Sequence, residues 1–160
     1  MNSNNKSQII GIGLTILMLL SLLNSGYFFL VAVQLNVSQW LAFNACSLTM
    51  IVYLVCFTIY LVRKESLWLS IPLLPMYYYG TMGLFLMPWN EVNIFAHATH
   101  VIITITILWT LYTLLKKLEF EILGKGLLVS MIVFVPIIAV IQTYNQANFE
   151  EFMQLLQNMQ

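Results

Sequence analysis

The stretch from residue 90 to residue 115 reads NEVNIFAHATHVIITITILWTLYTLL, and it decides the class of fold. No residue of the stretch after Glu91 is an Asp, Glu, Lys or Arg. A helix that crosses a bilayer needs about 20 mainly apolar residues. The stretch therefore predicts a membrane-spanning helix that starts at a polar surface.

The composition of the whole chain points the same way. Of its 160 residues, 61% are hydrophobic and 8% are charged, against about 25% charged in a soluble domain. A chain of this size cannot hide so much apolar surface in its own interior. We therefore expect an all-α integral membrane protein whose main partner is the lipid bilayer. The net charge of zero leaves no basic surface for nucleic acid.

Five stretches are long and apolar enough to be transmembrane helices. Together they predict a five-helix bundle over residues 1–144, followed by a tail over residues 145–160. The predicted spans are residues 9–33, 40–62, 67–87, 94–115 and 127–144.

The charges give an independent test of this count, because Lys and Arg collect in cytoplasmic loops. With five spans, all six basic residues fall on one side of the membrane. We therefore expect a cytoplasmic N-terminus and a C-terminus outside, in a plasma membrane or a bacterial inner membrane. The six basic residues are Lys6, Arg63, Lys64, Lys116, Lys117 and Lys125.

The third span contains two prolines and two glycines. Pro72 and Pro75 each remove a backbone donor, so this helix is expected to be kinked or locally open. Gly80 and Gly83 would allow a close neighbour. Shape complementarity within the bundle explains this pattern better than a hinge, because prolines are common in membrane helices.

The fourth span carries two polar stripes. Asn93, His97, His100 and Thr104 are spaced 4, 3 and 4 residues apart, which places them on one helix face. A second stripe of threonines at Thr99, 106, 110 and 113 follows another face and suits close helix packing. Two polar faces predict a central helix with little lipid contact.

Other spans hold polar side chains at the same predicted depth, near the outer surface. They include Gln142 on the fifth span. Polar groups inside a membrane tend to face the bundle interior, so we expect an outward-facing polar pocket beneath the loop over residues 88–93. The candidate ligand-binding residues are Asn44, Tyr78, Tyr79, Glu91, Asn93, His97, His100 and Thr104.

Three interpretations of the histidines remain open. They can be neutral side chains that bond to neighbouring helices, with Asn90 or Asn93 capping the fourth helix. They can line a pocket for a small neutral or anionic ligand. They can also bind a metal or haem, since imidazole is a common ligand. His97 and His100 alone are too few for a zinc site, which needs three or four protein ligands, so a partner subunit would have to complete it.

The predicted spans contain neither Asp nor Glu, and this excludes several chemistries. A di-iron bundle needs carboxylates on several helices, and proton-coupled pumps carry buried carboxylates along their path. The chain also lacks GxSxG, P-loop and GxGxxG motifs. These absences favour a protein that is not an enzyme.

The tail predicts an amphipathic helix on the outer face. Its apolar residues recur at helical spacing, and its other side lacks the basic residues that bind anionic lipid. We expect it to dock on the mouth of the bundle or on a partner, or else to anchor the fifth span at the interface. The apolar residues are Phe149, Phe152, Met153, Leu156 and Met159.

Three functions follow from the sequence. The first is a small ligand-binding or accessory subunit of a membrane complex, acting through the outer pocket. The second is a redox protein that holds a metal or haem at His97 and His100. The third is a component of an oligomeric channel or transporter. Possible protein partners are therefore another membrane subunit or further copies of this chain.

Overall fold

The structure is a computed structural model that describes residues 3–157, and all the regular elements within that range are helices. This confirms the all-α expectation. The elements are α1 (Ser3–Gly26), the π-helix η1 (Tyr27–Ala32), α2 (Val37–Phe43), α3 (Ala45–Arg63), α4 (Leu67–Ser70), α5 (Leu73–Pro75), the π-helix η2 (Met76–Thr81), α6 (Gly83–Leu86), the 3-10 helix η3 (Glu91–Asn93), α7 (Ile94–Lys116), α8 (Phe120–Ala147) and α9 (Phe149–Gln157).

Four helices in the described residues are long and apolar enough to cross a membrane. They are α1 continued by η1, then α3, α7 and α8, and they correspond to the first, second, fourth and fifth predicted spans. The bounds differ at several helix ends. The second predicted span begins inside α2, because the backbone leaves helical geometry at Asn44 (φ −113°, ψ 62°). The helix of the fifth span continues past Tyr144 to Ala147.

The third predicted span is not one helix but a series of short ones, α4, α5, η2 and α6. Pro72 and Pro75 lack the N–H groups that would bond to the carbonyls four residues earlier. The chain continues through a π-helical turn after Pro75, which widens the backbone ring. The expectation of a kinked, locally open helix is confirmed.

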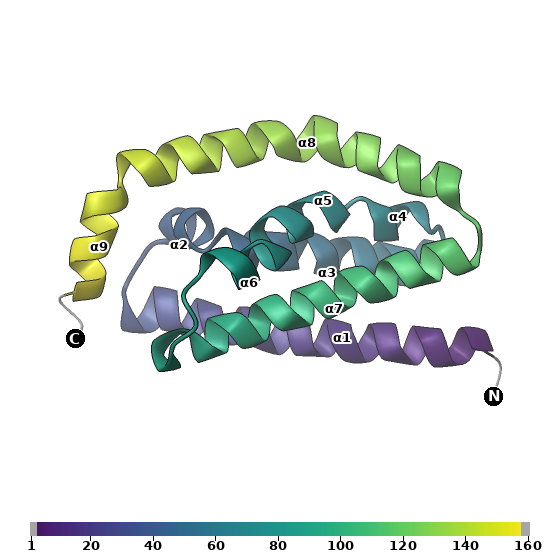
Figure 1. The fold of residues 1–160 in the computed structure, drawn as a ribbon, viewed down its shortest axis with the longest axis horizontal. Coiled ribbons are helices and arrows are strands. Elements are labelled where there is room, and N and C mark those ends of the chain that lie inside the picture. Colours follow the sequence, from purple (N-terminus) through teal and green to yellow (C-terminus); the bar gives the residue numbers. More distant parts are fainter. Residues whose placement is uncertain (1–2, 158–160) are drawn as a thin grey trace.

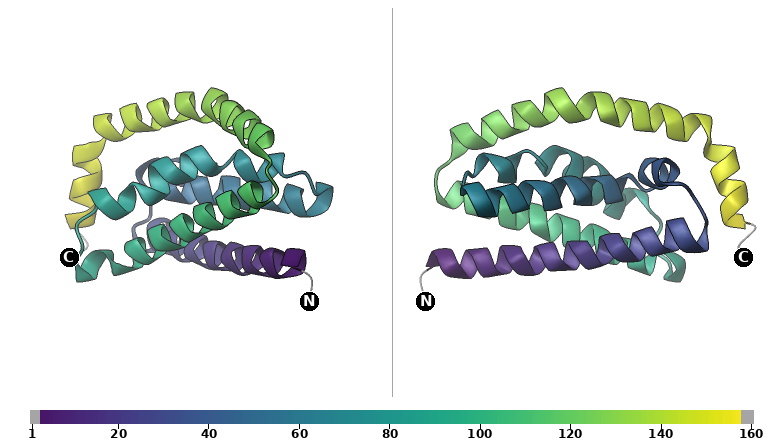
Figure 2. Two further views of the ribbon diagram at one scale, coloured as in Figure 1. Left: turned by 45° about the vertical axis from the view of Figure 1, so that its right-hand side comes forward. Right: turned by 180° about the vertical axis from the view of Figure 1, so that it is seen from behind.

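The helices form a layered bundle (Figures 1 and 2). The helices α3 and α7 lie in the middle, and α1 packs against both from one side. The segment from α4 to α6 packs against α3 and α7 from the other side. The helix α8 then covers this segment and lies on the opposite surface of the bundle from α1. The broken segment is therefore held between the continuous helices.

The core forms where α1, α3, α7 and the broken segment meet. It is built from large side chains without solvent exposure, among them Met50, Tyr53 and Ile103. Between membrane helices such side chains stabilise the bundle through close van der Waals packing, because lipid tails are as apolar as they are. Gly80 lies directly against Ile103, so the missing side chain lets the broken segment approach α7 closely.

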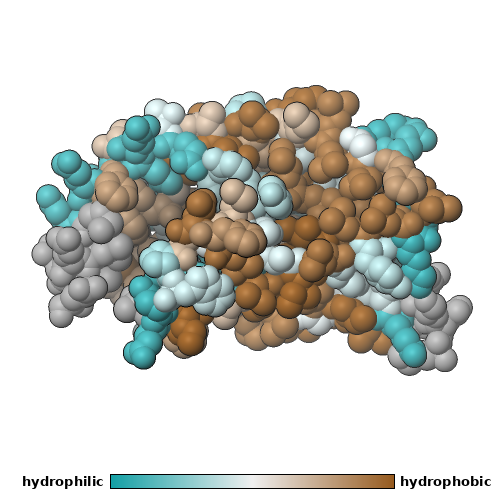
Figure 3. Space-filling model, viewed as in Figure 1, coloured by the Kyte–Doolittle hydropathy of each residue, from teal (hydrophilic) through white to brown (hydrophobic). Residues whose placement is uncertain are grey.

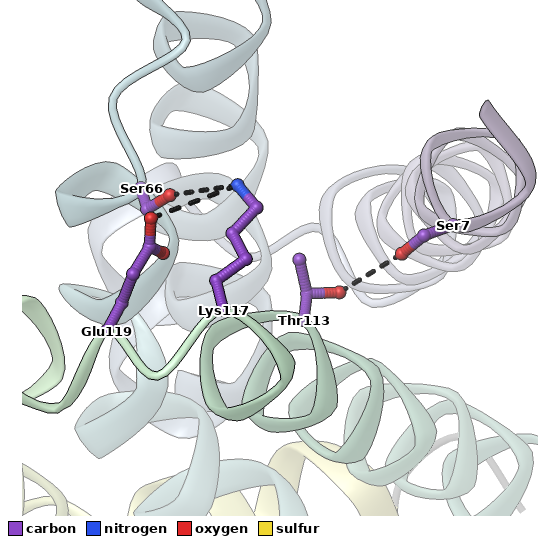
Figure 4. Close-up of polar contacts among 5 residues, drawn as sticks. All are labelled: Ser7, Ser66, Thr113, Lys117 and Glu119. Carbon is purple, nitrogen blue, oxygen red and sulfur yellow. Dashed lines mark hydrogen bonds and ion pairs between the residues drawn. The ribbon is translucent and has the colours of Figure 1, made fainter. Parts of the chain in front are cut away.

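The helix α7 has three faces. Three threonines of the second stripe are buried: Thr106, Thr110 and Thr113. Thr113 and Ser7 of α1 share a hydrogen bond of 3.2 Å (Figure 4), and Trp109 Nε1 donates to the Ser7 carbonyl. The histidine stripe faces the broken segment. A third face, with Leu108 and Tyr112, is exposed. The expected central position is therefore seen, but an apolar face between the polar ones is left uncovered by the other helices, which the polar stripes alone did not predict.

The bundle has a basic end, which holds the N-terminus and the α3–α4 and α7–α8 connections, and a far end, which holds the η1–α2 and α6–α7 connections and α9 (Figure 1). All six basic residues belong to the basic end. There Lys117 Nζ approaches Ser66 Oγ at 3.4 Å and Glu119 Oε1 at 4.0 Å (Figure 4). On the face in Figure 3, hydrophilic residues gather at the two ends and hydrophobic residues dominate between them.

The tail helix α9 turns across the far end of the bundle (Figures 1 and 2). The Phe152 ring stacks on the Phe43 ring at a centroid distance of 4.1 Å and an interplanar angle of 9°. It also lies 6.5 Å from the Phe29 ring. The structure thus places the start of the tail on the mouth of the bundle. The predicted apolar contacts of Met153, Leu156 and Met159 lie outside the side chains that the structure describes.

Candidate functional site

A cavity of about 360 Å³ lies near the far end, between the broken segment and α8. Residues 43–46, at the junction of α2 and α3, form part of its lining. One of them, Phe43, also stacks on Phe152 of α9. The volume is at the small end of the range typical of ligand pockets. Its polar lining residues are Asn44, Cys46, Tyr78, Tyr79, His100, Gln142 and Asn145.

Four of the eight predicted site residues therefore meet at one cavity: Asn44, Tyr78, Tyr79 and His100. They come from three separate segments of the chain. The other four, Glu91, Asn93, His97 and Thr104, lie outside the lining. Asn145 was assigned to the tail and so was missed as a site residue. Its position three residues after Gln142 would have placed both on one helix face, had the helix been extended past Tyr144.

His100 is held in one orientation. Its ring is buried, and Nδ1 lies 2.6 Å from the Gly80 carbonyl oxygen. A carbonyl only accepts, so Nδ1 carries the proton of the neutral ring and Nε2 keeps its lone pair. Gly83 lies against the edge of the same ring, because a Cβ there would be 2.6 Å from Nδ1. The imidazole is thus fixed between two glycines of the broken segment.

His97 belongs to a different cluster, around the loop carbonyl of Pro88. His97 Nε2 lies 3.1 Å from this oxygen, and Asn93 Nδ2 donates to it at 3.0 Å. The Trp89 ring stacks on the imidazole at 3.9 Å with an angle of 5°. Asn90 caps the helix start through the Asn93 N–H, as expected. The cluster therefore closes the α6–α7 connection onto α7.

The remaining two predicted residues are local. Thr104 donates to the His100 carbonyl at 2.8 Å and pairs with the Thr81 hydroxyl at 3.1 Å. These contacts fasten η2 to α7 one turn beyond His100. Glu91 is exposed in η3, where its carboxylate suits the positive end of the following helix.

Asn44 links α1, α2 and α3 at the wall of the cavity. Its Nδ2 donates to Ser25 Oγ at 2.6 Å and to Ser47 Oγ at 3.1 Å. Its Oδ1 accepts from Cys46 Sγ at 2.7 Å. Trp40 Nε1 also donates to Ser25 at 3.0 Å. The amide of Asn44 is therefore engaged by the protein on both sides.

Two further polar groups connect α8 to the cavity. Gln142 Nε2 approaches the Tyr78 hydroxyl at 3.5 Å, and the Tyr79 hydroxyl approaches the Ile138 carbonyl at the same distance. Asn145 Nδ2 donates to the Ala42 carbonyl at 2.7 Å, whereas its Oδ1 is buried without a partner. The cavity wall thus contains one acceptor that the protein leaves unsatisfied.

The described residues hold no group of three or more His, Cys, Asp or Glu side chains that could bind a metal ion. Each histidine uses one ring nitrogen on a backbone carbonyl and belongs to a separate cluster. A metal or haem at His97 and His100 would need further ligands from a second chain.

The comparisons give no relatives: the chain matches no protein-family model, no curated protein and no solved structure.

Proposed function

We propose that this chain is a five-span membrane protein with a cytoplasmic N-terminus, and that it binds a small ligand in an outward-facing cavity, either alone or as an accessory subunit of a membrane complex. The observation that carries this proposal is the meeting of four predicted polar residues at one cavity. Convergent polar groups on a mainly apolar lining are typical of binding sites.

The packing of the broken segment supports counting it as a membrane span, which makes five in total. It contacts α3, α7 and α8, which are all long enough to cross a membrane. Irregular backbone at membrane depth is tolerated where protein surrounds it. A segment held in this way runs through the same thickness of membrane as its neighbours.

The distribution of basic residues supports the orientation. All six Lys and Arg side chains belong to the basic end of the bundle, and such residues favour the cytoplasm. The cavity and α9 belong to the far end, which then faces outward. The test uses chains in which both native cysteines are replaced by alanine. A membrane-impermeant maleimide added to intact cells should label Glu150→Cys and leave Lys125→Cys unlabelled. The reverse pattern would refute the orientation.

The lining supports binding over catalysis, because it offers hydrogen bonds and apolar contacts that hold a molecule in place. The direct test is native mass spectrometry of the full chain, released from mild detergent. A ligand in the cavity, or a bound partner chain, appears as added mass.

Two variants on α6 locate any small adduct. Leu86 lines the cavity and is 76% exposed, and its neighbour Phe85 is 79% exposed and does not line it. We expect Leu86→Trp to fill the cavity and lose the adduct, and Phe85→Trp to keep it. No small adduct in the unmodified chain, or equal retention in both variants, would contradict the proposed pocket.

A further inference from the structure

The chemistry of the cavity narrows the class of ligand. None of the residues in its lining is an Asp, Glu, Lys or Arg. An ion moved into such a site loses its hydration and finds no opposite charge in return, which is strongly unfavourable. A neutral ligand is therefore favoured over both anions and cations.

The opening of the cavity is apolar. Its lining includes Phe43, Met82, Leu86 and Met87, and the Leu86 side chain is mostly exposed. The helix α8 packs against α4 and α5 on one side of the cavity and against α2 on the other, with only sparse contact to η2 and α6 between them. The gap in packing along α6 provides a lateral entrance for an apolar chain.

Two polar atoms at the wall, His100 Nε2 and Asn145 Oδ1, are fixed as acceptors. His100 Nδ1 and Asn145 Nδ2 both face backbone carbonyls, at 2.6 and 2.7 Å. Those carbonyls fix the ring tautomer and the amide orientation, so His100 Nε2 and Asn145 Oδ1 can only accept. Asn145 Oδ1 is buried without a partner, and an unmet buried acceptor is costly. Asn145 Oδ1 therefore lacks a donor, which the nearby Tyr78 hydroxyl and Gln142 amide do not supply.

We propose that the cavity binds a neutral lipid whose head is a hydroxyl group. The hydroxyl donates to Asn145 Oδ1 or His100 Nε2, and the apolar chain leaves along Met82 and Leu86 toward the bilayer. This inference rests on the proposed outer pocket and adds the chemical class of its ligand. A ketone, an ester or an ether lacks the donor, and a fatty acid or an ammonium amphiphile adds a charge that the lining does not match.

The test is photolabelling of the full chain in phosphatidylcholine nanodiscs by a diazirine derivative of 1-tetradecanol. The competitors share one chain length: 1-tetradecanol, its methyl ether, tetradecanoate and tetradecyltrimethylammonium. We expect labelled peptides from α6 and α8. We also expect the alcohol to compete at about tenfold lower concentration than the ether, the value of one hydrogen bond. The two charged competitors should be weaker still.

Three variants separate the parts of the proposal. Leu86→Trp should abolish labelling at α6 and α8, and Phe85→Trp should retain it. Asn145→Leu should keep the labelling and bring the alcohol-to-ether ratio close to one. Its matched control is Thr143→Val, because the Thr143 hydroxyl bonds within α8 and does not line the cavity. That control should keep the tenfold preference.

The outcomes distinguish the ligand class from the pocket itself. Equal competition by alcohol and ether, or better competition by a charged amphiphile, would overturn the hydroxyl assignment and leave the pocket standing. The same holds if no tetradecyl compound binds while native mass spectrometry finds another adduct that Leu86→Trp removes. No labelling and no adduct would overturn both proposals.

Discussion

The contact between Gly83 and His100 gives the sharpest test of the broken segment. A Cβ at position 83 would lie 2.6 Å from His100 Nδ1, closer than the two atoms can pack. The ring cannot simply turn away, because it is buried and its Nδ1 is bonded to the Gly80 carbonyl. We therefore expect Gly83→Ala to displace the imidazole and break this hydrogen bond.

The expected loss of stability has two parts. Leaving the buried carbonyl and ring nitrogen unpaired costs about 1–3 kcal/mol, and inserting a methyl group into a packed site costs about 1–3 kcal/mol. The better helix propensity of alanine returns about 0.5–1 kcal/mol. The free energy of unfolding should fall by about 1–5 kcal/mol. It can be measured by equilibrium unfolding in mixed micelles of mild detergent and SDS, followed by circular dichroism.

Gly13 provides the matched control, because a Cβ there meets no atom within 4 Å. Gly13→Ala should therefore be neutral or stabilise the protein by up to about 1 kcal/mol. In a His100→Ala background, where the ring is gone, Gly83→Ala should cost much less than alone, which is coupling in a double-mutant cycle. The described contact between Gly83 and His100 would be refuted by a Gly83→Ala protein that is as stable as Gly13→Ala. It would also be refuted if the stability losses of Gly83→Ala and His100→Ala simply add.

Three further predictions follow from other contacts. Gly126→Ala should lower the free energy of unfolding by about 1–3 kcal/mol, because its Cβ would clash with α4, whereas Gly124→Ala, which meets no atom within 4 Å, should not; equal effects would be inconsistent with this close approach of α8. Phe152→Ala should raise hydrogen exchange in α9 relative to Phe149→Ala, since the Phe152 ring is stacked and Phe149 is 59% exposed; unchanged exchange would contradict the docked tail. Lys117→Ala should change stability by less than about 1 kcal/mol, because its side chain is 42% exposed and 4.0 Å from its acidic partner; a larger loss would mean that this contact is worth more than its geometry suggests.

The sequence allowed the long helices to be predicted because membrane spans leave a strong signal in composition. Four predicted spans contain a long helix of the structure, and Pro72 and Pro75 marked the break in the third. The ends of the helices were harder to place. Asn44 interrupts the second span through its backbone geometry. The neighbouring residues in the sequence give no sign that the helix is interrupted there.

The candidate site was only partly predictable for a physical reason. The spacing of His97 and His100 correctly put them on one helix face, but their partners are the carbonyls of Pro88 and Gly80. Every residue has a carbonyl, so a sequence cannot indicate which one is available. The two histidines resemble a ligand pair in the sequence, but each ring bonds to a different part of the chain. Asn145 was not predicted because the tail was expected to begin where the sequence becomes polar, whereas the helix of the fifth span continues to Ala147.

The two histidines also have a consequence for how the protein is assembled in the membrane. The Gly80 carbonyl receives a hydrogen bond from His100 of α7, and the Pro88 carbonyl receives one from His97 of α7 and one from Asn93. The helix α7 is made later in the chain. In lipid an unpaired carbonyl such as that of Gly80 is unfavourable, so in the proposed five-span arrangement the region from Gly80 to Pro88 is not a finished structure until α7 is inserted. It becomes complete only when α7 docks beside it and supplies the missing donors. In the proposed arrangement the final packing of the third span therefore waits for the fourth, and the order in which helices reach their final places need not follow the order of synthesis.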